Sequence, residues 1–192
     1  MRVGFDGKNV VNNEESGNRG RDIIVSLADS YPDSDFLVYS PKFKENIAAT
    51  LKEIHNIRIC LPAASGFKGE LWRKFGITNN LPADKVDIYH GMDGQLPLNI
   101  KEAGIPSFLT IRNLEWMERP ERFSSIKRKL NDYICRKSCI NATYIIVPDE
   151  KIKMSVSNFY VISPDKIIIL DESLPGRVYS DKIMELYKEC IS

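Results

Sequence analysis

The sequence has 192 residues, which predicts one domain or one domain with a short appendage. Its 27 Lys and Arg residues nearly balance its 26 Asp and Glu residues, and the formal net charge of only +1 argues against nucleic acid or another polyanion as the main partner. No apolar run approaches the roughly 18 residues of a membrane span, and a strand pattern stands where a signal peptide would be, so we expect a cytoplasmic protein.

The four cysteines contain no C-x-x-C pair. Cys135 and Cys139 are four residues apart and would share one face of a helix, but no second pair of metal ligands lies near them, and Cys60 and Cys190 stand alone. We therefore expect buried free thiols, as in other cytoplasmic proteins, with neither a metal site nor a bound cofactor.

The chain begins with the pattern of a strand, a glycine-bearing loop and a helix. The strand is Arg2–Asp6, the loop carries Gly17 and Gly20, and apolar residues recur at helical spacing over residues 23–28. In open α/β sheets such a loop lies at the carboxyl end of the strand, where ligands bind, and the helix N-terminus offers free N–H groups to an anion or a sugar hydroxyl. The alternative is that the two glycines only let the chain turn into the helix.

The glycine spacing matches neither common phosphate-binding motif. Gly17 and Gly20 give only G-x-x-G, and the loop is too long for the tight turn of a dinucleotide-binding domain. A P-loop is also excluded, because the loop has no lysine followed by Ser or Thr.

Six more strand patterns follow, at residues 36–39, 57–61, 86–90, 106–111, 143–147 and 166–170. Helical patterns lie at 43–54, 124–141, 150–160 and 181–191, and a short amphipathic segment lies at 71–77. This alternation predicts an α/β, Rossmann-like fold: a doubly wound, mainly parallel sheet of about seven strands, with the first strand central and helices on both faces. Within the last two strands, the runs Tyr144–Val147 and Ile167–Leu170 are apolar at every position, which predicts that both of their faces are buried.

Apolar spacing also predicts which face each later helix buries. The helix at 150–160 would bury Ile152, Val156 and Phe159. In the helix at 124–141, the basic run Arg122–Lys137 would be the solvated face. Its predicted buried residues are Ile126, Leu130, Tyr133, Ile134 and Ile140, with Phe123 leading into the helix.

The order and spacing of several short segments resemble the N-terminal, acceptor-side domain of the family 4 retaining glycosyltransferases of the GT-B fold. The resemblance runs from Met1 to about Leu170. The segments that carry it are Gly4-Phe-Asp6, the loop Ser16–Asp22, Leu71-Trp-Arg73, Asp87–Gly91, Leu96-Pro97, Ile105-Pro106, Thr110-Ile111, the region of Arg136 in the long helix, Ile145–Pro148, Phe159-Tyr160 and Ile162–Lys166.

This resemblance implies sugar transfer from a nucleotide-sugar to a saccharide or lipid-linked acceptor, in bacterial envelope polysaccharide biosynthesis. In the family, the loop matching Gly17–Gly20 lies in the cleft between two domains, and the position matching His90-Gly91 lies near the acceptor. The fifth strand normally ends in a His-Asp pair whose His faces the donor sugar. Here Arg112-Asn113 takes that place, and a fixed cation cannot replace a neutral imidazole.

The resemblance therefore assigns residues to an acceptor-binding cleft and assigns no catalytic residue. For His90, local hydrogen bonds inside the fold are the competing interpretation, and for Arg112 and Asn113 it is a solvated loop pair. Asp6 would accept hydrogen bonds from the glycine loop and fix its shape. The candidate cleft residues are Gly17, Asn18, Arg19, Gly20, His90, Gly91, Arg112 and Asn113.

The last residues look like a helix that returns from a second domain in two-domain enzymes of this fold. We expect residues 1–175 to form the glycosyltransferase-like domain and residues 176–192 to form a helix packed back on it, with the donor domain lacking. Ser180 or Asp181 would be the N-cap. The alternative is an ordinary final strand–helix unit of the sheet. The expected apolar stripe is Ile183, Met184, Tyr187, Cys190 and Ile191.

Three functions remain open on the sequence. The first is an acceptor-side glycosyltransferase domain, inactive alone, which would meet a nucleotide-sugar only together with a donor domain. The second is a non-catalytic binding module or a partner of a separate donor domain, which the Arg112-Asn113 pair favours. The third is an unrelated flavodoxin-like protein, which the long first loop and the missing phosphate motif disfavour.

Overall fold

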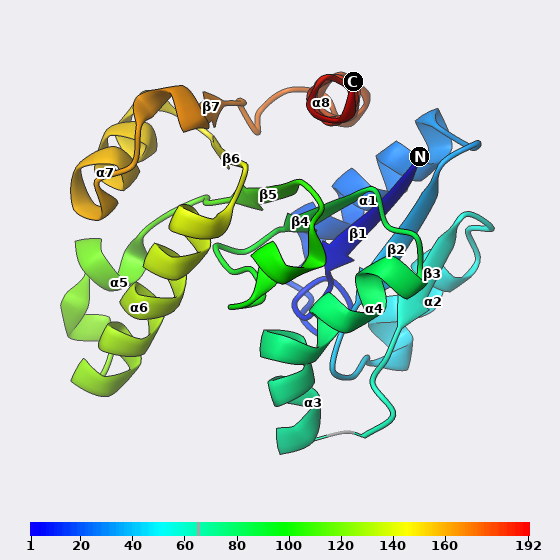
Figure 1. Ribbon diagram of the computed structural model, residues 1–192, viewed down its shortest axis with the longest axis horizontal. Helices are drawn as coiled ribbons and strands as arrows, with labels where there is room; N and C mark the ends of the chain where they lie inside the picture. Colours follow the sequence, from blue (N-terminus) through cyan, green and yellow to red (C-terminus); the bar gives the residue numbers. More distant parts are fainter. Residues whose placement is uncertain (65) are drawn as a thin grey trace.

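The computed structural model describes residues 1–64 and 66–192 and contains a single seven-stranded sheet (Figure 1). The strand order is β3-β2-β1-β4-β5-β6-β7, and every neighbouring pair is parallel. The predicted doubly wound α/β fold is confirmed, with β1 inside the sheet between β2 and β4. The strands are β1 Arg2–Asp6, β2 Asp35–Tyr39, β3 Ile57–Cys60, β4 Ile88–Gly91, β5 Ser107–Thr110, β6 Tyr144–Val147 and β7 Ile167–Ile169.

Helices connect the strands, and local sequence sets where two of them begin. The Ser124 side chain accepts a hydrogen bond from the Lys127 N–H, and the Asp149 side chain accepts one from the Ile152 N–H, so each caps a helix N-terminus. The α-helices are α1 Asn18–Ser30, α2 Glu45–Lys52, α3 Phe67–Leu71, α4 Ile77–Ala83, α5 Glu115–Glu118, α6 Ser125–Asn141, α7 Glu150–Tyr160 and α8 Gly176–Ile191. The π-helix η1 is Trp72–Gly76, and the 3₁₀-helices are η2 Ile100–Ala103, η3 Pro120–Arg122 and η4 Pro164–Lys166.

A separate hydrophobic core fills each face of the sheet. Adjacent residues of one strand point to opposite faces, so Phe108 packs in the core under α1 and α8, and Leu109 packs in the core under α4, α6 and α7. Because both faces are covered, the central strands are apolar at nearly every position.

Helix α8 lies against α1 and not beside β7, from which it follows in the chain (Figure 1). The Tyr31 hydroxyl donates to Asp181 at 2.8 Å, and the Arg19 guanidinium lies over the Tyr179 ring at 5.0 Å. The Tyr187 ring meets the Phe108 ring edge-on, with 5.0 Å between centroids. Helix α8 therefore covers the part of this sheet face above β4 and β5.

The sequence placed the start of α8 too late. The helix begins at Gly176 with Pro175 as its N-cap, and Ser180 is buried inside it, so the predicted cap at Ser180 or Asp181 is wrong. Ile183, Met184 and Tyr187 are fully buried as predicted, whereas Ile191 is exposed. Cys190 is partly buried against the same core, so within the predicted stripe only Ile191 is exposed.

The predicted buried face of α6 is wrong, although the helix itself is confirmed. The helix packs on the sheet through Ile134 and small residues, among them Cys135 and Cys139. Buried Ser138 accepts a hydrogen bond from the Leu96 N–H at 2.9 Å and donates one to the Ile134 carbonyl at 2.8 Å, so it satisfies a polar group in the core. The other predicted core residues, Ile126, Leu130, Tyr133 and Ile140, are exposed.

Two smaller burial predictions are also corrected. In α7 the buried third residue is Tyr160, and Phe159 is exposed, because Tyr160 continues the turn of Ile152 and Val156 at i+4. Strand β7 is an edge strand, so Ile167 is buried but Ile169 is exposed. Within the described residues, no helix combines the length and apolar character needed to cross a membrane.

Candidate ligand-binding cleft

A cleft of about 330 Å³ opens at the carboxyl edge of the sheet. Its walls are the loop before α1 and the segments that follow β4 and β5, which parallel strands bring to the same edge. The lining residues are Glu15, Ser16, Arg19, Asp93, Gly94, Ile111, Arg112, Asn113 and Trp116. Of the eight predicted site residues, Arg19, Arg112 and Asn113 line this cleft.

Arg112 is held in place by two carboxylates. Its Nε donates to Glu172 at 2.7 Å, and its Nη1 donates to Asp93 at 3.1 Å and to the Met92 carbonyl at 2.6 Å. Only 20% of the side chain is exposed, so Arg112 is not half of a solvated loop pair, whereas Asn113 is exposed. The sequence could not show this because Glu172 lies 60 residues along the chain.

Three N–H donors of the cleft residues have no hydrogen-bond partner within the described part of the chain: Arg112 Nη2, Arg19 Nε and Trp116 Nε1. Arg19 is also anchored, because its Nη2 donates to the Glu172 carbonyl at 2.6 Å. Unpaired buried donors are costly, and these three atoms are almost fully excluded from solvent, so a ligand oxygen satisfies them only where it enters the cleft to hydrogen-bond distance. The cleft thus combines two fixed guanidinium groups with two carboxylates, which suits a hydroxyl-rich or anionic ligand.

A buried ion pair lies at the same carboxyl edge of the sheet as the cleft. Asp6, at the end of β1, receives two hydrogen bonds from Arg73 of the π-helix, one of them 2.9 Å long from Nε to Oδ1. Arg73 also donates to Gln95 at 3.1 Å. The expectation that Asp6 accepts from the first loop holds for one N–H, that of Lys8, and not for the N–H groups of Gly17 or Gly20, so the main partner of Asp6 is Arg73. Its only backbone donor in the described residues is the Lys8 N–H, at 3.2 Å.

The glycines Gly17, Gly20 and Gly91 allow close packing of the backbone, and none of them lines the cleft. A Cβ at Gly17 would overlap the carbonyl oxygens of Asn9 and Asn13, and a Cβ at Gly91 would overlap that of Gln95. Gly20 is likewise buried, against Val10. These residues shape the cleft walls, which gives the two loop glycines a structural role beyond turning the chain.

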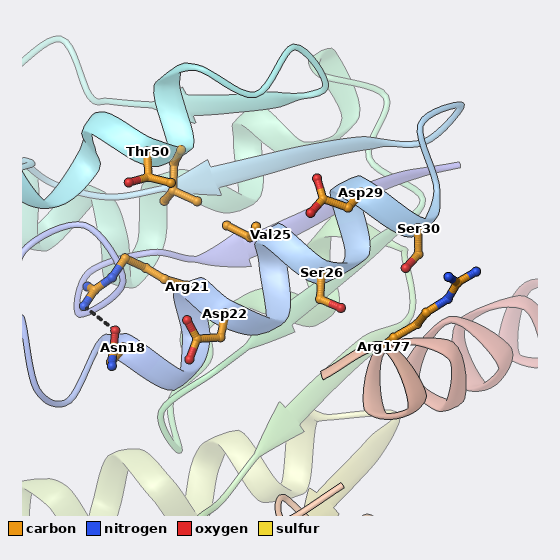
Figure 2. Close-up of a pocket in the computed structure, with 10 residues that line it drawn as sticks. Asn18, Arg21, Asp22, Val25, Ser26, Asp29, Ser30, Thr50 and Arg177 are labelled. Carbon is orange, nitrogen blue, oxygen red and sulfur yellow. Dashed lines mark hydrogen bonds between the residues drawn. The ribbon is translucent and has the colours of Figure 1, made fainter. Parts of the chain in front are cut away.

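Asn18 does not line the cleft but lines a second groove of about 630 Å³ along α1 (Figure 2). There its Oδ1 accepts a hydrogen bond from Arg21 Nη2 at 3.2 Å, and the groove is closed by Thr50 of α2 and Arg177 of α8. This groove is larger than the cleft, but its side chains are ordinary surface residues of three helices. We place the candidate site at the carboxyl edge, where the strand ends converge.

His90 is buried and does not reach the cleft. Its Nδ1 lies 2.5 Å from the Tyr187 hydroxyl, and its Nε2 lies 2.7 Å from the Thr110 hydroxyl, both beneath α8. The side chain is fully excluded from solvent. Its assignment to the cleft is therefore corrected in favour of the alternative, a histidine satisfied by hydrogen bonds inside the fold.

The burial of His90 predicts that the folded protein loses stability at acidic pH. Burial, and then the charge of Arg112, lower the pKa of His90 from 6.5 to about 3. Between these values the unfolded chain binds a proton that the folded chain does not, so stability is complete above pH 6.5 and falls as the pH drops toward 3. The expected slope from this residue is up to about 1.4 kcal/mol per pH unit. Urea unfolding across this pH range measures it.

The matched control for this prediction is the other histidine, His55, which is exposed. His90→Gln should flatten the dependence of unfolding free energy on pH, and His55→Gln should leave it as in the parent chain. Equal slopes for the parent chain and His90→Gln would show that His90 is not the responsible group.

The candidate residues taken from the sequence did not include Asp93 and Trp116, which line the cleft, or Glu172, which holds Arg112. Asp93 could have been predicted from the sequence, because it follows β4 at the carboxyl edge two residues after Gly91. Its Oδ2 accepts from Asn9 at 3.0 Å, which ties it to the first loop. Glu172 comes from the segment between β7 and α8, whose path over the sheet edge no local pattern reveals.

Comparison with known proteins identifies the fold of the chain and does not identify a family. No family model and no curated protein matches the chain. Among solved structures, Anabaena Alr3699/HepE in complex with UDP and glucose matches with a TM-score of 0.60 at 15% identity, over 98% of this chain and 49% of that one. Sucrose-phosphate synthase from Thermosynechococcus elongatus matches with a TM-score of 0.66 at 10% identity, over 100% of both chains.

Nucleotide-sugar epimerases share the fold too. The UDP-GlcNAc 2-epimerase of Methanocaldococcus jannaschii matches with a TM-score of 0.55 at 14% identity, over 96% of this chain and 50% of that one. The chain thus spans about half the length of HepE and of the epimerase. It has the fold of one Rossmann-like domain of GT-B-type proteins.

Proposed function

We propose that this chain is the acceptor-side domain of a GT-B glycosyltransferase of the family 4, retaining type, and that it binds a saccharide or lipid-linked acceptor without transferring sugar by itself. The observation that carries the proposal is the cleft at the carboxyl edge, where Arg19, Arg112 and Trp116 hold unpaired N–H donors. Such donors, beside the carboxylates of Asp93 and Glu172, are the groups that bind sugar hydroxyls or a phosphate.

The sequence and the solved structures support the class of reaction. Arg19 of the first loop, which the glycosyltransferase resemblance assigns to the cleft between two domains, lines this cleft. The solved structures with this fold act on or bind nucleotides and sugars by their names. In such a role the domain would orient the acceptor and help to stabilise the leaving diphosphate. The position of α8 against α1 supports the further proposal that α8 is the helix that returns from a second domain.

A non-catalytic binding module is the second candidate, and the contacts of Arg112 favour it. Arg112 stands where the family has a His facing the donor sugar, and Glu172 and Asp93 hold its guanidinium in ion pairs. It can neutralise an anion but cannot accept a proton. The buried His90 does not replace that function, because α8 covers it.

Binding measurements test the proposal through Arg112. In isothermal titration we expect saccharides from a panel of mono- and oligosaccharides to bind weakly, near millimolar, and UDP-glucose to show no micromolar binding. Arg112→Ala should weaken the saccharide affinity about ten-fold or more, because it removes charge-assisted hydrogen bonds.

The matched control is Arg58→Ala, which removes an exposed arginine of β3 that is paired with Asp84 away from the cleft, and it should leave binding unchanged. Micromolar binding of UDP-glucose, or sugar transfer by the chain alone, would contradict the acceptor-only role. Saccharide binding that both variants weaken equally would place the site elsewhere.

A further inference from the structure

Helix α6 exposes the apolar stripe that its sequence was expected to bury. Ile126, Leu130, Tyr133 and Ile140 are 82%, 48%, 52% and 45% exposed. At 3.6 residues per turn these positions fall on one side of the helix, opposite the face that packs on the sheet. We call them the α6 stripe. A contiguous row of large apolar side chains in water contributes nothing to folding and marks an interaction surface.

Basic residues are interleaved with the α6 stripe. Lys129, Arg136 and Lys137 are exposed and fall on the same side of the helix. Helix α6 contains five Lys or Arg residues and a single acid, Asp132, so its net charge is +4. Because the whole chain carries only +1, all other residues together carry −3. Three of the five basic residues of α6, namely Lys129, Arg136 and Lys137, therefore lie where the apolar side chains are exposed.

The C-terminal end of α7 adjoins this surface and adds to it. Arg136 Nη2 donates to the Phe159 carbonyl at 3.2 Å, and both Phe159 and Val161 are exposed, the latter at 86%. Val161 has φ 55°, a left-handed conformation that is unfavourable for a β-branched residue. Figure 1 shows α5, α6 and α7 together at the end of the molecule opposite α2 and β3.

We propose that the α6 stripe and its Lys and Arg residues dock on an anionic lipid membrane. A helix with apolar side chains between basic ones lies in the membrane interface, with the apolar side chains among the acyl chains and the cations on lipid phosphates. The basic residues on the stripe side favour this occupant, because in self-association through the α6 stripe the like charges of Lys129, Arg136 and Lys137 in two copies would face each other and repel. The proposal does not depend on the function of the cleft.

Vesicle sedimentation tests this surface with phosphatidylcholine alone and with phosphatidylcholine containing phosphatidylglycerol. We expect the chain to bind only the anionic vesicles and to be released at high salt. Lys129→Glu with Lys137→Glu should lower the vesicle affinity at least about ten-fold, since each basic residue near the surface contributes about five-fold. Ile126→Ser with Leu130→Ser should also abolish most binding, because it removes the inserted side chains.

Matched substitutions elsewhere on the surface control for charge and polarity. Lys44→Glu, just before α2, combined with Lys182→Glu, on α8, makes the same change of charge as the α6 lysine variant. Val178→Ser, on α8, replaces an exposed apolar side chain by a polar one, as the α6 serine variant does. Both should bind as the parent chain does. Because all of these positions are exposed, thermal unfolding should remain close to that of the parent chain.

Three results would overturn the proposal. The first is no binding of the parent chain to anionic vesicles. The second is an equal loss of vesicle affinity in the α6 variants and in the control variants. The third is self-association of the chain that the α6 variants abolish, because this would assign the stripe to a second copy.

Discussion

Deletion of residues 179–192 is expected to leave a chain that no longer folds stably. The deletion removes four fully buried side chains of α8: Tyr179, Ile183, Met184 and Tyr187. Each contributes roughly 1.5–3 kcal/mol by burial alone, and together they approach the roughly 5–15 kcal/mol that stabilises a whole domain. The deletion also exposes Phe108 and His90, which α8 covers. Circular dichroism melting and binding of a hydrophobic dye measure the loss.

Point variants within α8 separate burial from a general effect of the helix. Ile183→Ala should lower the unfolding free energy by about 2–5 kcal/mol, because its side chain is fully buried. Ile191→Ala, at a position 46% exposed in the same helix, should change it by no more than about 0.5 kcal/mol. An unchanged melting temperature in the deleted chain would show that α8 is not part of the folded core.

The sequence was sufficient to predict the sheet because each strand is a short apolar run bounded by turn residues. The seven expected strands all occur, with ends that differ by only one or two residues. Parallel strands buried on both faces show this pattern most plainly. The exception is β7, whose edge position depends on strand order and not on its own residues.

The faces of the later helices were harder to predict, because tertiary packing decides between competing apolar sides. Helix α6 has large apolar residues on one side and small ones on the other. The small side, with Cys135, Ser138 and Cys139, lies against the sheet because small side chains let the helix approach closely. A prediction that takes the side with the largest apolar residues as the buried face therefore selects the wrong side of α6.

The candidate site was predictable in position but not in its pairings. From the rule that ligands bind at the carboxyl edge, Arg19, Arg112 and Asn113 were predicted to share one cleft, and these three residues line it. It could not show that α8 would bury His90, nor that Asp6 would pair with Arg73, 67 residues away. Such contacts depend on which elements cross the sheet edge, and a single sequence carries no record of them.

Loss of the Asp6–Arg73 ion pair should cause the largest effect of any single substitution at the carboxyl edge. The two side chains are 6% and 8% exposed and share two hydrogen bonds. Arg73→Ala leaves a buried carboxylate without its partner, which costs about 3–5 kcal/mol. The pair also joins β1 to the π-helix and, through Gln95, to the segment after β4. Urea unfolding should therefore show a large loss of stability, and any ligand binding in the cleft should weaken with it.

Two comparisons identify the cause of that loss. Arg73→Lys should recover only part of the stability, because an ammonium group cannot donate the two parallel hydrogen bonds of a guanidinium. Arg122→Ala breaks an exposed ion pair with Glu115, whose side chains are 56% and 45% exposed, and should cost less than about 1 kcal/mol. Replacing both partners, as in Asp6→Leu with Arg73→Met, should cost less than Arg73→Ala alone, since no charge is then left buried. If Arg73→Ala unfolds at the same urea concentration as Arg122→Ala, the ion pair does not stabilise the fold and the cleft does not depend on it.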